Sequence, residues 1–125
     1  MTLILDAGAL VAIDRFDRRV QALLTVARDA GIPVSTSAGV VAQVWRNGSR
    51  QANLARMLAG AYTAPLDPTT ARRLGLLLGA TGSADVVDAH IAWLAKDGDH
   101  VLTSDPGHIG QLLATRKVRA SITTV

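Results

Sequence analysis

Short apolar runs alternate with helical patterns along the whole chain, and this alternation limits the possible folds more than any other feature of the sequence. The apolar runs that have the character of strands are residues 3–5, 32–36, 62–66, 100–103 and 120–125. Strands that alternate with helices of about 10–15 residues form parallel sheets covered on both faces. The sequence therefore predicts one α/β domain over residues 1–125, with a mainly parallel sheet of four to five strands.

Capping residues mark where the helices of this domain begin. We expect helices from about residue 9, over 18–30, after Ser37, over 50–58, after Asp67, over 83–97 and after Asp105. Asp67-Pro68 and Asp105-Pro106 both combine Asp at the N-cap with Pro at the first helical position. An Asp at the end of a strand therefore has a structural explanation as well as a functional one, and Asp67 is the internal comparison because nothing gives it a catalytic role.

Composition excludes several classes of protein. The chain has no Cys, which rules out a disulfide scaffold, a thiolate zinc site and a Cys nucleophile. No apolar run reaches the ~18 residues of a membrane helix, and the N-terminus has no basic region before Asp6, so we expect a cytoplasmic protein without a membrane anchor. The formal net charge is +3, carried mainly by 11 Arg, which permits nucleic acid as a partner.

Four aspartates fall where parallel strands would bring them together. Asp6 follows the first strand, and Asp105 follows the fourth. Asp85 and Asp88 are three residues apart, so they share one face at the start of a helix. In open α/β sheets, ligands bind beyond the carboxyl ends of the strands. We therefore expect the four carboxylates to meet at one edge of the sheet.

A cluster of carboxylates predicts a divalent cation. Four neighbouring carboxylates repel one another, and a cation relieves that repulsion. Oxygen ligands suit Mg²⁺ or Mn²⁺, which keep several waters and bind substrate phosphates. Such an ion polarises a phosphoryl group and lowers the pKa of its bound water. The constellation therefore predicts hydrolysis of a phosphodiester bond rather than simple binding.

Three segments, taken together, resemble the motifs of the PIN domain. They are LILDAGAL at residues 3–10, SADVVDAHIA at residues 83–92 and VLTSD at residues 101–105. Their order and the size of the chain are most similar to the VapC-type toxins of bacterial toxin–antitoxin pairs. The resemblance implies a three-layer α/β/α fold and a metal-dependent endoribonuclease that hydrolyses RNA. It also implies a homodimer and a cognate VapB-type antitoxin.

The resemblance assigns roles to individual acids. Asp6 matches the first acid of the family, and Asp88 matches the third, with Asp85 one turn earlier. Asp105 matches the acid that follows the last inner strand. In the family these acids hold one or two Mg²⁺ or Mn²⁺ ions, and a metal-bound water attacks the RNA phosphodiester.

Neighbouring polar residues complete the expected site, with one departure from the family. Thr103 and Ser104 offer hydroxyls close to Asp105. The family's second acid is usually Glu, but the corresponding position here is Gln43, and the chain contains no Glu at all. Loss of one carboxylate weakens a divalent site by about 1–3 kcal/mol if the geometry survives. We expect Arg46 and Arg15 to contact RNA phosphates near the acids.

Two further interpretations follow from the same residues. With Gln43 in place of Glu, the chain is alternatively a catalytically silent PIN domain that binds RNA or a protein partner. An Asp that ends the first strand also occurs in receiver and haloacid-dehalogenase domains. Those domains need a second Asp at position 8 or a Lys on a late strand, whereas position 8 is Gly and the only lysines are Lys96 and Lys117.

Overall fold

All five predicted strands are present in the computed structural model, which describes residues 1–125. The strands are β1 (Leu3–Leu5), β2 (Val34–Ser37), β3 (Tyr62–Ala64), β4 (His100–Thr103) and β5 (Ser121–Thr124). They form one sheet in the order β3-β2-β1-β4-β5, and every neighbouring pair is parallel. The predicted parallel sheet is therefore confirmed, with five strands.

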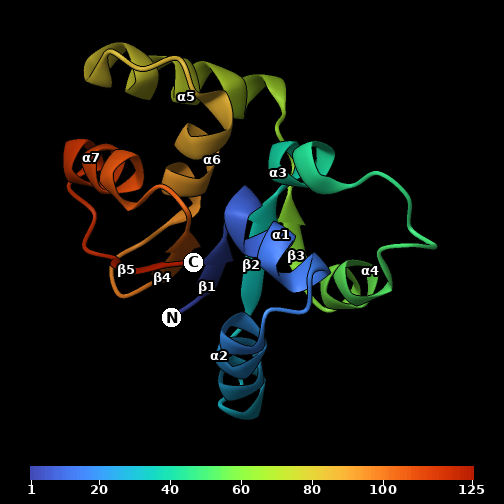
Figure 1. Cartoon of the computed structure of the whole chain (residues 1–125). Helices are drawn as coiled ribbons and strands as arrows, with labels where there is room; N and C mark the ends of the chain where they lie inside the picture. Colours follow the sequence, from blue (N-terminus) through green and yellow to red (C-terminus); the bar gives the residue numbers. More distant parts are fainter.

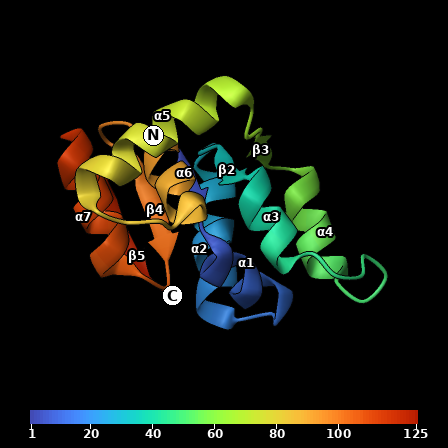
Figure 2. The same ribbon diagram turned by 90° about the horizontal axis from the view of Figure 1, so that it is seen from above.

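Seven helices cover both faces of this sheet (Figure 1). They are α1 (Ala7–Asp14), α2 (Arg18–Asp29), α3 (Ala38–Val44), α4 (Ala52–Ala59), α5 (Pro68–Thr81), α6 (Val86–Leu94) and α7 (Pro106–Arg116). Figure 2 shows α1 to α4 on one side of the sheet and α5 to α7 on the other. This arrangement is the predicted three-layer α/β/α fold. None of the helices combines the length and apolar character that a membrane span requires.

The core lies on both faces of the two central strands. Every residue of β1 and the middle of β4 are buried, because helices cover these strands on both sides. The largest side chains with almost no exposed surface include Ile4, Leu5, Leu10, Ile13, Leu54, Leu74, Ile91, Leu102, Ile109 and Leu112. These residues come from both helical layers and from the sheet, so a single core joins all three layers.

Several element boundaries differ from the prediction, and local capping and backbone conformation account for the differences. Helix α1 begins at Ala7 rather than Ala9, because the Asp6 side chain caps it directly. Helix α6 begins at Val86, with Asp85 as its N-cap, and it ends at Leu94, where Ala95 takes an extended conformation. Strand β3 ends at Ala64, just before a proline that has no N–H for the sheet.

After β3, the chain changes the side of β1 on which it adds the next strand. The first three strands extend the sheet to one side of β1, and β4 and β5 extend it to the other. The helices that follow β1 and β4 therefore leave toward opposite faces from the carboxyl ends of these two strands. In doubly wound folds, ligands bind at such a switch point. Asp6 follows β1, and Ser104 and Asp105 follow β4, so all three lie at this place.

Candidate functional site

Asp6 is held rigidly at the switch point by both its backbone and its side chain. Its backbone N–H donates to the Leu102 carbonyl at 3.1 Å. One carboxylate oxygen, Oδ1, accepts the Ala9 N–H at 3.0 Å, and the other, Oδ2, accepts the Ser104 N–H at 3.1 Å. The residue is only 3% exposed. Each oxygen retains a further lone pair, so the carboxylate is oriented but still able to bind a cation.

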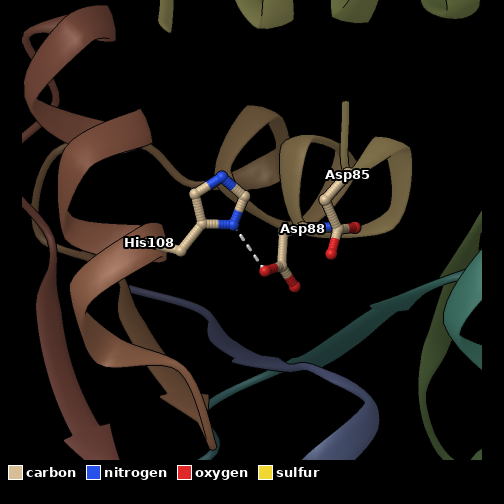
Figure 3. A group of neighbouring side chains, drawn as sticks. All are labelled: Asp85, Asp88 and His108. Carbon is tan, nitrogen blue, oxygen red and sulfur yellow. Dashed lines mark hydrogen bonds and ion pairs between the residues drawn. The ribbon is translucent and has the colours of Figure 1, made fainter. Parts of the chain in front are cut away.

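Asp85 and Asp88 lie together at the start of α6, and His108 of α7 faces them (Figure 3). Asp85 caps the helix by accepting the Asp88 N–H at 3.0 Å. His108 Nδ1 lies 2.7 Å from Asp88 Oδ2 and forms a hydrogen bond with it. The three side chains each offer a ligand atom, and these atoms lie within 4.8 Å of one another. This trio is the group of acids and histidine best arranged for a metal ion.

The electrostatic environment of Asp88 links this trio to Asp6. The pKa of Asp88 is raised, first by burial and then by the negative charges of Asp85 and Asp6, while the hydrogen bond from His108 opposes the rise. The charge of Asp6 therefore contributes to the environment of Asp88. A half-buried carboxylate whose pKa is raised close to other acids favours a bound cation.

His108 is the residue of this site that the sequence did not indicate. The three histidines, His90, His100 and His108, show no metal-ligand spacing in the sequence. His108 reaches Asp88 because α7 begins at the carboxyl end of β4, beside β1. Its Nε2 is buried without a hydrogen-bond partner. That nitrogen points away from the acids in Figure 3, so the ring orients Asp88 through Nδ1.

Asp105 caps the helix that carries His108. Its Oδ1 accepts the His108 N–H at 3.2 Å, and its own N–H donates to Thr103 Oγ1 at 2.9 Å. Thr103 is buried, whereas Ser104 and Asp105 are exposed. The structure gives Asp105 no hydrogen bond to the other three aspartates. Asp105 thus lies at the predicted edge of the sheet, and its side chain caps α7 through the His108 N–H.

Gln43 lines a hollow beside α1 and α3. This hollow has a volume of about 540 Å³ and is lined by Val11, Asp14, Arg15, Gln43, Val44, Arg46, Asn47, Arg50 and Gln51. None of the four aspartates of the predicted site lines it. Gln43 itself is exposed. The two arginines that we predicted to contact RNA, Arg15 and Arg46, line the same hollow and give it a basic wall.

Gln51, which the sequence did not single out, holds this hollow in shape. Its Oε1 accepts the backbone N–H groups of Arg46 and Asn47 at 2.7 and 3.0 Å. Its Nε2 donates to the Val44 carbonyl at 3.0 Å and to Asp14 Oδ2 at 3.3 Å. One buried amide therefore ties the loop after α3 to α1. The contact with Asp14 spans 37 residues, so no local sequence pattern could reveal it.

His90 has a structural role in this fold. Its ring is 1% exposed, and Nδ1 lies 2.6 Å from Ser37 Oγ. Ser37 Oγ also accepts the Gly39 N–H at 3.1 Å, so the His90 ring belongs to a hydrogen-bonded group at the start of α3. Burial lowers the pKa of His90, and the charge of Asp67 opposes this shift only partly.

The lowered pKa of His90 predicts a loss of stability in mild acid. Below the ordinary histidine pKa of about 6.5 the unfolded chain takes up a proton that the folded chain refuses, so the free energy of unfolding falls as pH falls. We expect this slope, of at most about 1.4 kcal/mol per pH unit, between pH 7 and pH 5 in urea-unfolding experiments. His90→Asn should flatten the slope. An unchanged slope in the variant would assign the acid sensitivity to another group.

The chain has the same fold as a chain of a solved structure. It matches a chain of "Crystal structure of VapBC2 from Rickettsia felis bound to a DNA fragment from their promoter" with a TM-score of 0.71 and 13% sequence identity. The match covers 98% of this chain and 99% of that chain. No protein-family model and no curated protein matches the sequence. At this identity the likeness concerns the fold alone, and the three-layer PIN-like fold that the motifs predicted is therefore confirmed.

Proposed function

We propose that the chain is a metal-dependent endoribonuclease and the toxin of a VapBC-type pair. The observation that carries this proposal is the acidic group of Asp85 and Asp88, which lies within the electrostatic reach of Asp6 at the switch point of a PIN-like sheet. A solvated surface cluster would not need two carboxylates to be buried or half-buried beside one another. Asp6 and Asp88 are both largely withdrawn from solvent.

The residues present fit a divalent cation. The donors are carboxylate oxygens, which suit Mg²⁺ or Mn²⁺, and the pKa of Asp88 is raised by burial and, to a smaller extent, by the charges of Asp85 and Asp6. We assign Asp6, Asp85 and Asp88 as the residues that would hold one or two such ions, with Asp105 as a fourth ligand. When bound, the ion neutralises negative charge on the phosphate and makes a water molecule more acidic.

The protein's own contribution is to hold these groups in place. Two backbone N–H groups fix the carboxylate of Asp6, and His108 fixes that of Asp88. Thr103 Oγ1 accepts the Asp105 N–H and thereby shapes the turn that leads to His108. A site held in this way loses little conformational freedom when substrate binds, which favours reaction at a defined phosphodiester.

The test of the proposal is cleavage of RNA by the purified chain without any antitoxin. We expect cleavage with Mn²⁺ or Mg²⁺ and none with EDTA. Total cellular RNA, transfer RNA and synthetic oligonucleotides should all be used, because the sequence does not indicate the target. If the metal-loaded protein cleaves no RNA in this panel, the proposal is wrong.

We propose the basic hollow beside α1 and α3 as the surface that binds the RNA backbone. Arg15 and Arg46 line it, and Arg46 Nη1 is anchored on the carbonyls of Ala42 and Trp45 at 3.2 and 2.7 Å. An anchored guanidinium keeps donors for a phosphate while losing little freedom on binding. Gln43, on the same wall, adds an amide that can bind a sugar or a phosphate oxygen.

Replacing both arginines should weaken RNA binding in a salt-dependent manner. We expect the Arg15→Gln, Arg46→Gln double variant to lower the slope of log affinity against log salt by about 0.7 for each phosphate that it no longer binds. Fluorescence anisotropy with a labelled single strand at several salt concentrations measures this slope. The control is Arg72→Gln, Arg119→Gln, which removes the same charge elsewhere. Equal slopes in the two double variants would exclude the hollow as the RNA surface.

A VapB-type antitoxin and a second copy of the chain are the partners that we propose. The support is the fold shared with the VapBC2 structure. The proposed setting is the cytoplasm, where RNA is available. A short upstream reading frame that encodes a DNA-binding protein, and co-purification of its product with this chain, would identify the antitoxin.

The second candidate is a catalytically silent PIN domain that binds RNA or a protein partner. The observation that favours it is the uncharged side chain of Gln43, which lies on the wall of the basic hollow. At this sequence position the family usually has Glu. Titration with Mn²⁺ separates the two candidates. The ribonuclease should bind Mn²⁺ saturably below millimolar concentration, whereas the silent domain should not.

A further inference from the structure

Gly8 leaves a space beside Asp6 that the side chain of Ser104 fills. Gly8 is the second residue of α1, and Ser104 is the first residue after β4. A Cβ atom on Gly8 would lie 2.5 Å from Ser104 Cβ, 3.3 Å from Ser104 N, and in severe overlap with Ser104 Oγ. Real Cβ atoms do not approach other atoms as closely as the first of these distances. Any side chain at position 8 must therefore displace Ser104.

The backbone conformation of Gly8 does not require glycine. The glycines with positive φ are Gly31, Gly82 and Gly98, and Gly8 is not among them. Alanine is more favourable than glycine inside a helix, so glycine here has a cost in local stability. Gly75 of α5 is also helical, but a Cβ there would meet no atom within 4 Å. Space for Ser104 is thus the specific reason for glycine at position 8.

The close approach of Ser104 to Gly8 links Asp6 to the helix that carries His108. Ser104 N–H donates to Asp6 Oδ2 at 3.1 Å across 98 residues of sequence. The next residue, Asp105, caps α7, and α7 carries His108 to Asp88. A shift of Ser104 would therefore release one oxygen of Asp6 and move the turn that sets the position of His108.

We propose that Gly8 is a positioning residue of the acidic site, and that it acts by seating Ser104 against the start of α1. This packing of Ser104 on Gly8 sets the orientation of the Asp6 carboxylate and the distance from Asp6 to Asp88 and His108. This inference rests on the proposed function only for its effect on metal binding, because the packing itself belongs to the metal-free chain. Gly8 touches no reacting group, and its effect passes entirely through Ser104.

The first experiment compares Gly8→Ala with the control Gly75→Ala. In Gly8→Ala we expect amide exchange of Ser104, measured by NMR on the metal-free protein, to become at least about tenfold faster, because the hydrogen bond to Asp6 is broken. Mn²⁺ affinity should fall by about 10- to 100-fold, as it does when a group that orients a ligand is removed. Gly75→Ala should change neither quantity, since its Cβ meets no atom within 4 Å.

The second experiment removes the overlap by shortening the side chain of residue 104. Ser104→Gly added to Gly8→Ala removes the two closest atoms and keeps the N–H that binds Asp6, so amide protection at position 104 and Mn²⁺ affinity should both recover. Normal Ser104 protection in Gly8→Ala, or no recovery in the double variant, would overturn the proposal. If the wild-type chain binds no Mn²⁺ but the exchange results hold, the positioning role stands and the proposed metal-dependent function fails.

Discussion

Asp88→Asn is expected to reduce RNA cleavage by at least about a thousandfold, because it removes a carboxylate ligand from the centre of the acidic group. The same change should raise the melting temperature of the metal-free protein by a few degrees. Asn keeps an oxygen that can accept the hydrogen bond from His108, so the packing survives. Cleavage assays with Mn²⁺ and thermal unfolding in EDTA measure the two effects on one preparation.

The increase in stability follows from the sign of the Asp88 pKa shift. Burial and the charges of Asp85 and Asp6 raise this pKa, so the folded chain holds a proton that the unfolded chain has already released. Folding stability therefore falls as pH rises through the carboxyl range, and the neutral Asn avoids that loss. The two melting temperatures should converge below about pH 3, where the carboxyl is protonated in both states.

Asp67→Asn is the matched control for Asp88→Asn. Asp67 also caps a helix, accepting the Thr70 N–H at 2.7 Å, but it lies outside the acidic group. Cleavage should be unchanged in this variant. Its stability should not rise, because cap bonds lower the pKa of Asp67 instead of raising it. Full activity in Asp88→Asn, or a fall in its metal-free melting temperature, would contradict the proposed role of Asp88.

Asp6→Asn is expected to abolish cleavage and to destabilise the fold by about 1–3 kcal/mol. The two oxygens of Asp6 accept N–H groups from Ala9 and Ser104 in a buried setting. An amide has only one oxygen, so its NH₂ group must face one of these donors and leave it unsatisfied. Urea unfolding of the metal-free variant measures the decrease in stability. Loss of activity alone, with full stability, would mean that the displaced backbone N–H group had found another acceptor.

Asp17→Asn separates this effect from ordinary helix capping. Asp17 caps α2 through a single bond from the Val20 N–H at 3.0 Å, and it is exposed. Asn is as good an N-cap as Asp, so this variant should differ little from wild type in stability and activity. The contrast between a stabilising change at position 88, a destabilising one at 6 and a neutral one at 17 would distinguish three environments of the same side chain.

Local patterns in the sequence were sufficient to predict the layers and the edge that carries the acids. The apolar run before Asp6 is a strand because its side chains are buried on both faces of a parallel sheet. Asp67 and Asp105 cap the helices that their following prolines begin, as local capping chemistry predicts. Parallel strands bring their carboxyl ends to one edge, which is why Asp6, after β1, and Asp105, after β4, could be placed at the same edge from the sequence.

The contacts between distant side chains depended on the tertiary structure. His108 reaches Asp88 because of how α7 is rotated and seated on α6, and no spacing rule describes that rotation. Gln43 lies in the predicted helix, and the tertiary structure places it beside Arg15 and Arg46 on the wall of one hollow.

The sequence by itself thus determined the strands, the helix caps at Asp67 and Asp105, and the sheet edge at which Asp6 and Asp105 lie. The tertiary structure alone decided that Ser104 occupies the space left by Gly8 and that His108 holds Asp88. The physical reason is one of range. Burial and capping act between residues close in the chain, whereas a hydrogen bond between distant segments depends on ångström-scale positions that only the packed core defines.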